Sequence, residues 1–316
     1  MTKKTWFIIA ASLILTGCLI FGGVMISLDW NFLGLSTNKF TTNTHSLSVD
    51  FDDLKIDLSA TDVEVIMTNE QTATVVCYED EKEPHEVLVE EGVLIVRNKS
   101  NKKWYEYIGI NFNSPKITIY LPTKQYGNIE VAGSSGDVIV KDLSAGSLKI
   151  TLSTGDITLS GVNSEGDIIA NLSTGNVEIA DSSCRDFILT ASTGHLIAER
   201  LVAANEISVK QSTGEVKITD SSCLKFSSSA STGDLVLERV VAASEIRVTR
   251  STGDVSLNSC DSARIYVKTD TGDIKGKLLS KMNFVTQTDT GKISVPDEPS
   301  DKICELTTDT GDIIFK

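Results

Sequence analysis

The sequence predicts an all-β protein, a single-chain β-solenoid that follows an N-terminal transmembrane helix. Three observations lead to this fold class. A Ser/Thr-Gly-Asp motif recurs ten times at intervals of 19 or 20 residues; apolar and polar residues alternate on both sides of each glycine; and the chain of 316 residues starts with a long uncharged apolar run. A repeat this short is typical of stacked β-coils.

Each repeat predicts two short strands. Around Gly214, for example, Ile207 and Val209 share one parity before the glycine, and Val216 starts a second inward set after it, whereas Lys210 falls on the polar, outward parity of the first strand. One coil cannot bury its own apolar face, so the stack is the cooperative unit. The ten glycines that define the units are Gly136, Gly155, Gly175, Gly194, Gly214, Gly233, Gly253, Gly272, Gly291 and Gly311.

The glycine of each unit is expected at a tight bend that needs a positive φ. A longer period of 39 residues also appears, so that Cys184 and Cys223 occupy the same column two coils apart. Strands are spaced by about 4.8 Å, which separates these two cysteines by roughly 9–10 Å. That is beyond the reach of a disulfide. We therefore expect the cysteines to be small buried or half-buried residues rather than a disulfide framework.

The chain divides into three parts. We assign residues 1–28 to a membrane anchor, 29–50 to a linker and 51–316 to the β-solenoid ectodomain. The solenoid has irregular first coils over 51–130 and regular Ser/Thr-Gly-Asp coils over 131–316.

The irregular part contains a degenerate copy of the repeat. Leu58–Val65 resembles Leu152–Leu159 with the glycine lost, and two further strands are expected at Val93–Val96 and Lys116–Tyr120. Two loops are expected between these strands, an acidic one from Glu79 to Glu91 and an aromatic one from Lys102 to Phe112.

The N-terminal segment predicts export of the rest of the chain. Lys3 and Lys4 precede an uncharged run over Thr5–Leu28, which is long enough to span a bilayer as a helix. Positive charge stays inside, so the ectodomain is expected outside the cytoplasm. A rival interpretation stays open, because Leu15–Cys18 also looks like a lipobox in which Cys18 would be lipidated.

The charge disfavours nucleic acid as a partner. The net charge is −14, and leaving out the two positive charges of Lys3 and Lys4 gives −16 for the exported part. No basic stripe is visible in the sequence. No motif calls for a cofactor, and the expected partners are the membrane and an unknown protein or cell-wall component.

The anchor, the Ile119–Pro122 segment and the Ser/Thr-Gly-Asp coils together resemble the bacterial putative-adhesin family, a domain of unknown function that includes LiaG-like cell-envelope proteins. The resemblance covers roughly Phe51–Lys316. It implies a β-helical ectodomain linked to surface attachment or envelope stress. It carries over no catalytic or binding residues.

The residue after each glycine forms a column rich in carboxylates. Such a ladder, spaced by about 4.8 Å, could hold Ca²⁺, which prefers several oxygen ligands. The alternative is that each Asp caps its own turn, and this is favoured by Asn176, His195 and Lys292 in the same column. The aspartates of the candidate cation ladder are Asp137, Asp156, Asp234, Asp254, Asp273 and Asp312.

Two further surfaces are candidate contacts. Trp104, Tyr105 and Tyr107 could form an aromatic platform for a ligand, or could cover an open end of the core. The chain stops soon after Ile314 and Phe315, so the last coil is expected to be uncovered and to invite a partner or a second copy.

These features favour a surface binding, adhesion or scaffold module over an enzyme. Alternatives are a passive structural or envelope-stress accessory protein and, less favoured, a polysaccharide-acting enzyme. The chemistry of the latter needs a groove with convergent carboxylates or basic groups. The repeats are short and uniform, and we name no catalytic residue.

Cys18 distinguishes the two kinds of anchor. If the helix is retained, metabolic labelling with a fatty acid should leave the protein unlabelled, and the mature chain should keep its first residues. Labelling that disappears in Cys18→Ala would instead establish a lipoprotein.

Overall fold

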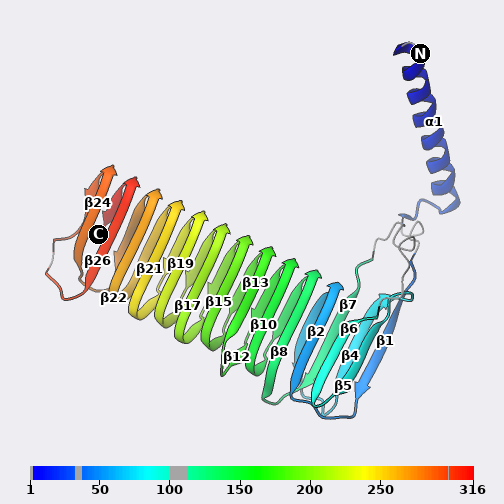
Figure 1. Ribbon diagram of the computed structural model, residues 1–316, viewed down its shortest axis with the longest axis horizontal. Helices are drawn as coiled ribbons and strands as arrows, with labels where there is room; N and C mark the ends of the chain where they lie inside the picture. The colour runs from blue at the N-terminus through cyan, green and yellow to red at the C-terminus, as the bar shows by residue number, and fades with distance from the viewer. Residues whose placement is uncertain (1–2, 33–37, 100–112, 298) are drawn as a thin grey trace.

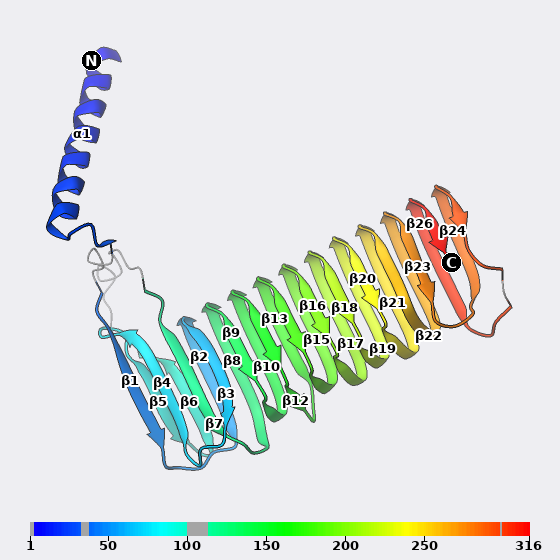
Figure 2. The ribbon, with the colours of Figure 1, turned by 180° about the vertical axis from the view of Figure 1, so that it is seen from behind.

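The computed structural model describes residues 3–32, 38–99, 113–297 and 299–316, and it shows a β-solenoid preceded by one helix (Figures 1 and 2). The predicted fold class is confirmed. Helix α1 spans Lys3–Ser27, and nearly all of its apolar side chains are exposed. By length and composition this helix can cross a membrane.

The solenoid has two sheets whose strands lie side by side along the rod. The two sheets share β22, whose first part belongs to sheet A and whose last part belongs to sheet B. In spatial order, sheet B contains β5 (His85–Glu90), β6 (Val93–Asn98), β2 (Asp53–Ala60), β8 (Tyr126–Ser135), β10 (Ser144–Thr154), β13 (Ile168–Thr174), β15 (Ser183–Thr193), β17 (Val202–Thr213), β19 (Ser222–Thr232), β21 (Val241–Thr252), β22 (Val255–Thr271), β26 (Ile303–Thr310) and β24 (Asn283–Thr290), with the short β12 (Asn163–Ser164) between β10 and β15. Sheet A contains β1 (Phe40–Leu47), β4 (Ala73–Asp80), β7 (Lys116–Pro122), β3 (Asp62–Thr68), β9 (Val138–Lys141), β11 (Ile157–Ser160), β14 (Val177–Ala180), β16 (Leu196–Glu199), β18 (Val216–Thr219), β20 (Leu235–Glu238), β22, β23 (Ile274–Leu278), β27 (Ile313–Phe315) and β25 (Ile293–Ser294).

The regular coils stack in register, as the alternation predicts. Ile207 pairs with Phe187 on one side and Phe226 on the other, and all three side chains are fully buried. Lys210, on the opposite parity, is exposed. The inward residues of successive coils thus form continuous apolar columns, which make one core along the rod.

Two constraints require glycine at the bend of each regular coil: a positive φ, and the close approach of the backbone of the adjacent coil. Gly194 has a φ of 148°, and a Cβ there would clash with the carbonyl oxygen of Gly175 in the preceding coil. The degenerate first coil is confirmed: β2 pairs with β8 and β3 with β9, and Thr61 stands against Gly136 where a glycine would be expected.

The end of the rod nearest the helix, here called the proximal end, differs from the predicted organisation. The proposed linker over 29–50 contains β1, which pairs antiparallel with β4. The proposed acidic loop over Glu79–Glu91 is mostly strand, because β4 continues to Asp80 and β5 pairs antiparallel with β6. Antiparallel strands therefore close this end, and the sequence did not reveal them because they do not carry the repeat.

The other end is here called the distal end. The prediction that the coil of Ile314 and Phe315 is uncovered there is wrong. The last strand, β27, lies between β23 and β25. In the other sheet, β26 lies between β22 and β24 (Figures 1 and 2). The outermost coil is therefore β24–β25, although it comes earlier in the chain. Both units carry the same pattern, so the repeat does not specify which of them stacks on β22–β23.

The cysteines behave as buried side chains rather than as a disulfide framework. All six are free; Cys18 is exposed on α1 and the other five are buried. Desolvation raises the pKa of the Cys184 and Cys223 thiols to about 12.

The inward parity can be tested with a matched pair. Ile207→Asp places an unpaired carboxylate in the apolar column and should unfold several coils, whereas Lys210→Asp on the outer face should be tolerated. Thermal unfolding followed by circular dichroism measures both. Equal melting temperatures for the two variants would contradict the assigned parity.

Candidate functional site

The column that follows the glycines forms a hydrogen-bonded ladder between coils. The side chain at this position accepts a hydrogen bond from the backbone N–H of the equivalent residue in the adjacent coil, at 2.7–3.1 Å. The series runs from Asp62 through Asp137, Asp156, Asn176 and His195 to the N–H of Glu215, and from Asp234 through Asp254, Asp273 and Asp312 to the N–H of Lys292.

This ladder gives the aspartates a structural role that differs in detail from the expected one. Each side chain caps the bend of its neighbour rather than its own bend. Asn176 and His195 fit the column because Oδ1 and Nδ1 are also acceptors. Among the described residues, the ladder carboxylates are not grouped closely enough to share a cation. The cation ladder stays a prediction that the geometry does not favour.

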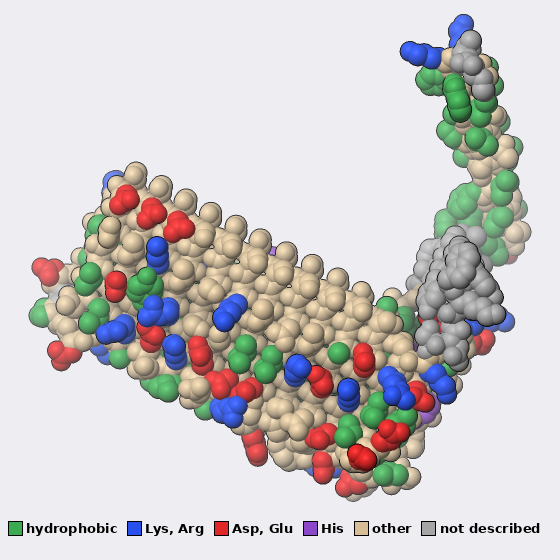
Figure 3. Space-filling view, viewed as in Figure 1, with side chains coloured by type: hydrophobic (Ala, Val, Ile, Leu, Met, Phe, Trp, Pro, Cys, Tyr) green, Lys and Arg blue, Asp and Glu red, His purple; other side chains and the backbone are tan. Residues whose placement is uncertain are grey.

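An exposed row of threonines runs beside the ladder along one edge of the rod. We call it the threonine ridge. It runs from β10 to β24, and the upper edge of the rod in Figure 3 is mostly free of charged and hydrophobic side chains. A shallow depression of about 530 Å³ lies along it between Asp137 and Gly214. The ridge residues, paired in register, are Thr154, Thr174, Thr193, Thr213, Thr232, Thr252, Thr271, Thr310 and Thr290.

The chemistry of the ridge changes along the rod. The residue before each ridge threonine is serine from Ser153 to Ser251, and it becomes aspartate at Asp270, Asp309 and Asp289 in the three distal coils. The ridge thus offers neutral hydroxyl groups over most of its length and carboxylates at its distal end. Such a surface donates and accepts hydrogen bonds at a regular strand spacing of about 4.8 Å.

A buried polar network lies at the proximal end, which the sequence did not predict. Glu79 on β4 is 1% exposed, and its Oε2 accepts hydrogen bonds from the backbone N–H of His85 and from His85 Nδ1, both at 2.6 Å. Its Oε1 accepts a hydrogen bond from Asn43 Nδ2 on β1 at 2.5 Å. His85 Nε2 lies 3.2 Å from Thr61 Oγ1 and 3.5 Å from Asn98 Nδ2. The network therefore ties β1, β4, β5 and β6 to the bend of the first coil.

The order hydroxyl, imidazole, carboxylate in this network is that of a catalytic triad. Thr61, however, is only 5% exposed, and His85 only 6%. A cavity of about 160 Å³ borders both residues. Burial and complete hydrogen bonding of Glu79 fit a structural role, with the carboxylate satisfied by three neutral or imidazole donors.

The same network contains one metal-ligand set. Cys77 Sγ, a Glu79 oxygen and a His85 nitrogen lie within 4.8 Å of one another, the only such group among the described residues. Sulfur, nitrogen and oxygen donors suit Zn²⁺. Desolvation, with a smaller contribution from Glu79, raises the pKa of the Cys77 thiol to about 12. This raised pKa opposes the deprotonation that metal binding requires.

Two predicted contact sites are not tested by the geometry. Trp104, Tyr105 and Tyr107 lie outside the described residues. Cys18 is exposed on α1, and its lipidation stays a prediction. The buried network could have been found from the sequence, because Ala73, Val75 and Cys77 set an inward parity that places Glu79 inside.

Together, the stacked coils, the glycine bends and the leading apolar helix define a parallel β-solenoid protein with one candidate membrane anchor. The Toastrack DUF4097 family matches residues 51–196 and 163–316. The chain therefore belongs to this family, a domain of unknown function, and the resemblance to putative adhesins is confirmed.

The chain is also similar to several solved structures. The chain is similar to a putative adhesin from Bacteroides fragilis NCTC 9343, with 16% identity, 89% of this chain and 99% of that chain covered, and a TM-score of 0.43. It is also similar to a putative adhesin from Parabacteroides distasonis ATCC 8503, with 14% identity, 88% of this chain and 98% of that chain covered, and a TM-score of 0.49. A putative lipid binding protein from the same organism has 17% identity to this chain, with 76% of this chain and 98% of that chain covered and a TM-score of 0.41. No curated protein sequence matches the chain.

The buried network predicts a large stability effect at Glu79. Glu79→Ala leaves the donors of His85 and Asn43 without an acceptor in the interior, so the free energy of unfolding should fall by about 3 kcal/mol. Glu81→Ala, two residues away and exposed, is the control and should change it by less than about 0.5 kcal/mol. Denaturant unfolding measures both, and similar values would show that the network contributes little.

Proposed function

We propose that this protein is a membrane-tethered, extracytoplasmic binding or adhesion module of the cell envelope, and that the threonine ridge is its contact surface. The helix supplies the tether, with Lys3 and Lys4 on the cytoplasmic side. The rod carries the ridge away from the membrane. The partner is a cell-wall component or an envelope protein.

The continuity of the threonine ridge is the observation that supports this proposal most. The alternating pattern requires only that outward residues be polar, and the outer faces of the sheets vary accordingly among Thr, Asn, Lys, Ser and Gln. The ridge instead keeps threonine in nine consecutive coils. A repeated hydroxyl array matches a partner that itself repeats, such as a glycan strand, because each repeat can meet equivalent donors and acceptors.

The ridge can be blocked without a change of charge. In the full chain, Thr154→Gln combined with Thr193→Gln should lower binding to isolated cell-wall fragments at least fivefold, since long side chains cover the hydroxyl row. Thr151→Gln with Thr190→Gln is the matched control, because these exposed threonines lie in the same coils three residues earlier, on the outer face of sheet B. Cosedimentation of the detergent-solubilised protein with the fragments measures the effect.

The alternatives give different results in the same assay. Absence of binding by the unmodified protein to cell-wall fragments and to solubilised envelope proteins would favour a passive structural or envelope-stress accessory role. Release of soluble sugar fragments that is lost in His85→Ala would favour a polysaccharide-acting enzyme. Equal loss of binding in the ridge and control variants would show that the ridge is not the contact surface.

A further inference from the structure

We propose that the distal end of the rod binds the distal end of a second copy of this chain, through antiparallel pairing of β24 with β24 of that copy. The proposal deepens the proposed function, because it names a partner for adhesion between two surfaces. It concerns a different part of the molecule from the threonine ridge, so an experiment can contradict one of the two proposals without contradicting the other.

The outermost strand has an open edge. β24 pairs with β26 on one side, and no strand among the described residues covers its other side. The N–H of Asn283 points toward β26, where it donates to the carbonyl oxygen of Lys302 at 2.8 Å. Backbone groups alternate in direction along a strand of a parallel ladder, so those of Phe284, Thr286 and Thr288 point to the open edge. An open edge of this kind favours strand addition.

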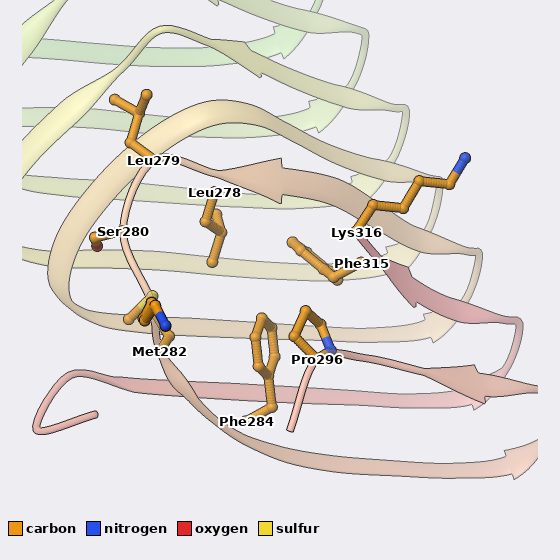
Figure 4. Close-up of a pocket in the computed structure, with 9 residues that line it drawn as sticks. Leu278, Leu279, Ser280, Met282, Phe284, Pro296, Phe315 and Lys316 are labelled. Atoms are coloured by element: carbon orange, nitrogen blue, oxygen red, sulfur yellow. The ribbon is translucent and has the colours of Figure 1, made fainter. Parts of the chain in front are cut away.

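The end of the rod is also apolar. Val285 is 55% exposed, and Phe284 packs against Phe315 with ring centroids 5.4 Å apart. A cavity of about 210 Å³ opens beside these rings, lined also by Met282 and Pro296 (Figure 4). β24 itself carries a single charged side chain, Asp289. Long edge strands with few charges are what proteins otherwise avoid.

The side chains of β24 fit an isologous pairing. If the two-fold axis passes through Val285, each Phe284 lies opposite Thr286 of the second copy, and their edge-directed backbone groups exchange hydrogen bonds. The same register places Val285 opposite Val285, and Asp289 opposite Lys281 of the second copy. An apolar pair at the centre and opposite charges at both ends are favourable cross-strand pairs.

The position of the membrane helix favours the distal end as the site of pairing, and it favours a two-fold arrangement of the two rods. β1 begins 13 residues after the last residue of α1, so the proximal end stays next to the membrane. The distal end is the one that can reach another surface. Two-fold pairing of two distal ends joins the rods in line and leaves their helices at opposite ends. It therefore connects two membranes rather than two molecules on one membrane.

One pair of ends makes a small contact. A strand of eight residues is roughly 26 Å long and two sheets are about 10 Å apart, which gives an end face of roughly 300 Å² per copy. Stable interfaces bury about 800 Å² per partner, so a single pair is weak and attachment depends on many pairs acting together. The proposal is therefore tested on vesicles that carry many copies.

Reconstitution of the full chain into two differently labelled populations of phosphatidylcholine vesicles provides the test. Vesicles with the unmodified protein should cluster. Val285→Lys places like charges opposite each other at the two-fold axis, and so does Val285→Glu; each should reduce clustering at least tenfold. Val202→Lys, at an exposed apolar site in the middle of the rod, is the control and should leave clustering unchanged.

A mixture of the two charge variants makes the test specific. Val285→Lys vesicles mixed with Val285→Glu vesicles should cluster again, because position 285 then faces its opposite charge across the axis. Rescue also shows that both variants are folded. Absence of clustering by the unmodified protein, or absence of rescue in the mixture, would overturn the proposal; neither result concerns binding to the cell wall.

Discussion

Close stacking of one backbone on the next at the glycine bends is the constraint on which the rest of this structure depends. At Gly194 a side chain of any size would meet the carbonyl oxygen of Gly175. That contact fixes the register of both sheets, because a unit that pairs at its bend must also pair along its strands. Register then aligns the apolar residues into columns and the polar residues into rows. The threonine ridge and the acceptor ladder are consequences of this alignment, since equivalent residues are repeated at the strand spacing.

A stack of coils leaves two ends, and the protein treats them differently. The proximal end is closed by antiparallel strands, and Glu79, His85 and Asn43 hold these strands to the first coil through buried hydrogen bonds. The distal end has a coil of the same kind as the interior coils and an exposed Val285. No strand among the described residues pairs with the outer edge of β24, so its outward backbone groups are available for pairing. The difference between the ends is therefore chemical as well as geometric, and it gives the rod a direction from the proximal to the distal end.

The sequence predicted what the repeat determines and little else. The parity that places Ile207 inside and Lys210 outside was readable because alternation alone specifies it. The order of the last two coils was not, because both units present the same pattern to β22 and β23. Glu79 was assigned to an acidic loop, although the parity of its strand places it inside; its donors, Asn43 and His85, come from other strands that the repeat does not mark. Arg250 is a similar case: it is 1% exposed, donates to Ser228 Oγ at 2.9 Å, and desolvation lowers its pKa to about 10.

The exchange of the last two coils also bears on how the distal end is held. The chain leaves β23, forms the outermost coil β24–β25, and returns to insert β26–β27 beneath it. The outermost coil is therefore connected by the chain to its inner neighbours at both of its ends, so fraying of this coil cannot release a free terminus. The C-terminal strand gains a pairing partner on each side and buries Phe315. An open edge is thus presented by a segment that is tied down on both sides, which keeps the edge ordered and lowers the entropy cost of adding another strand to it.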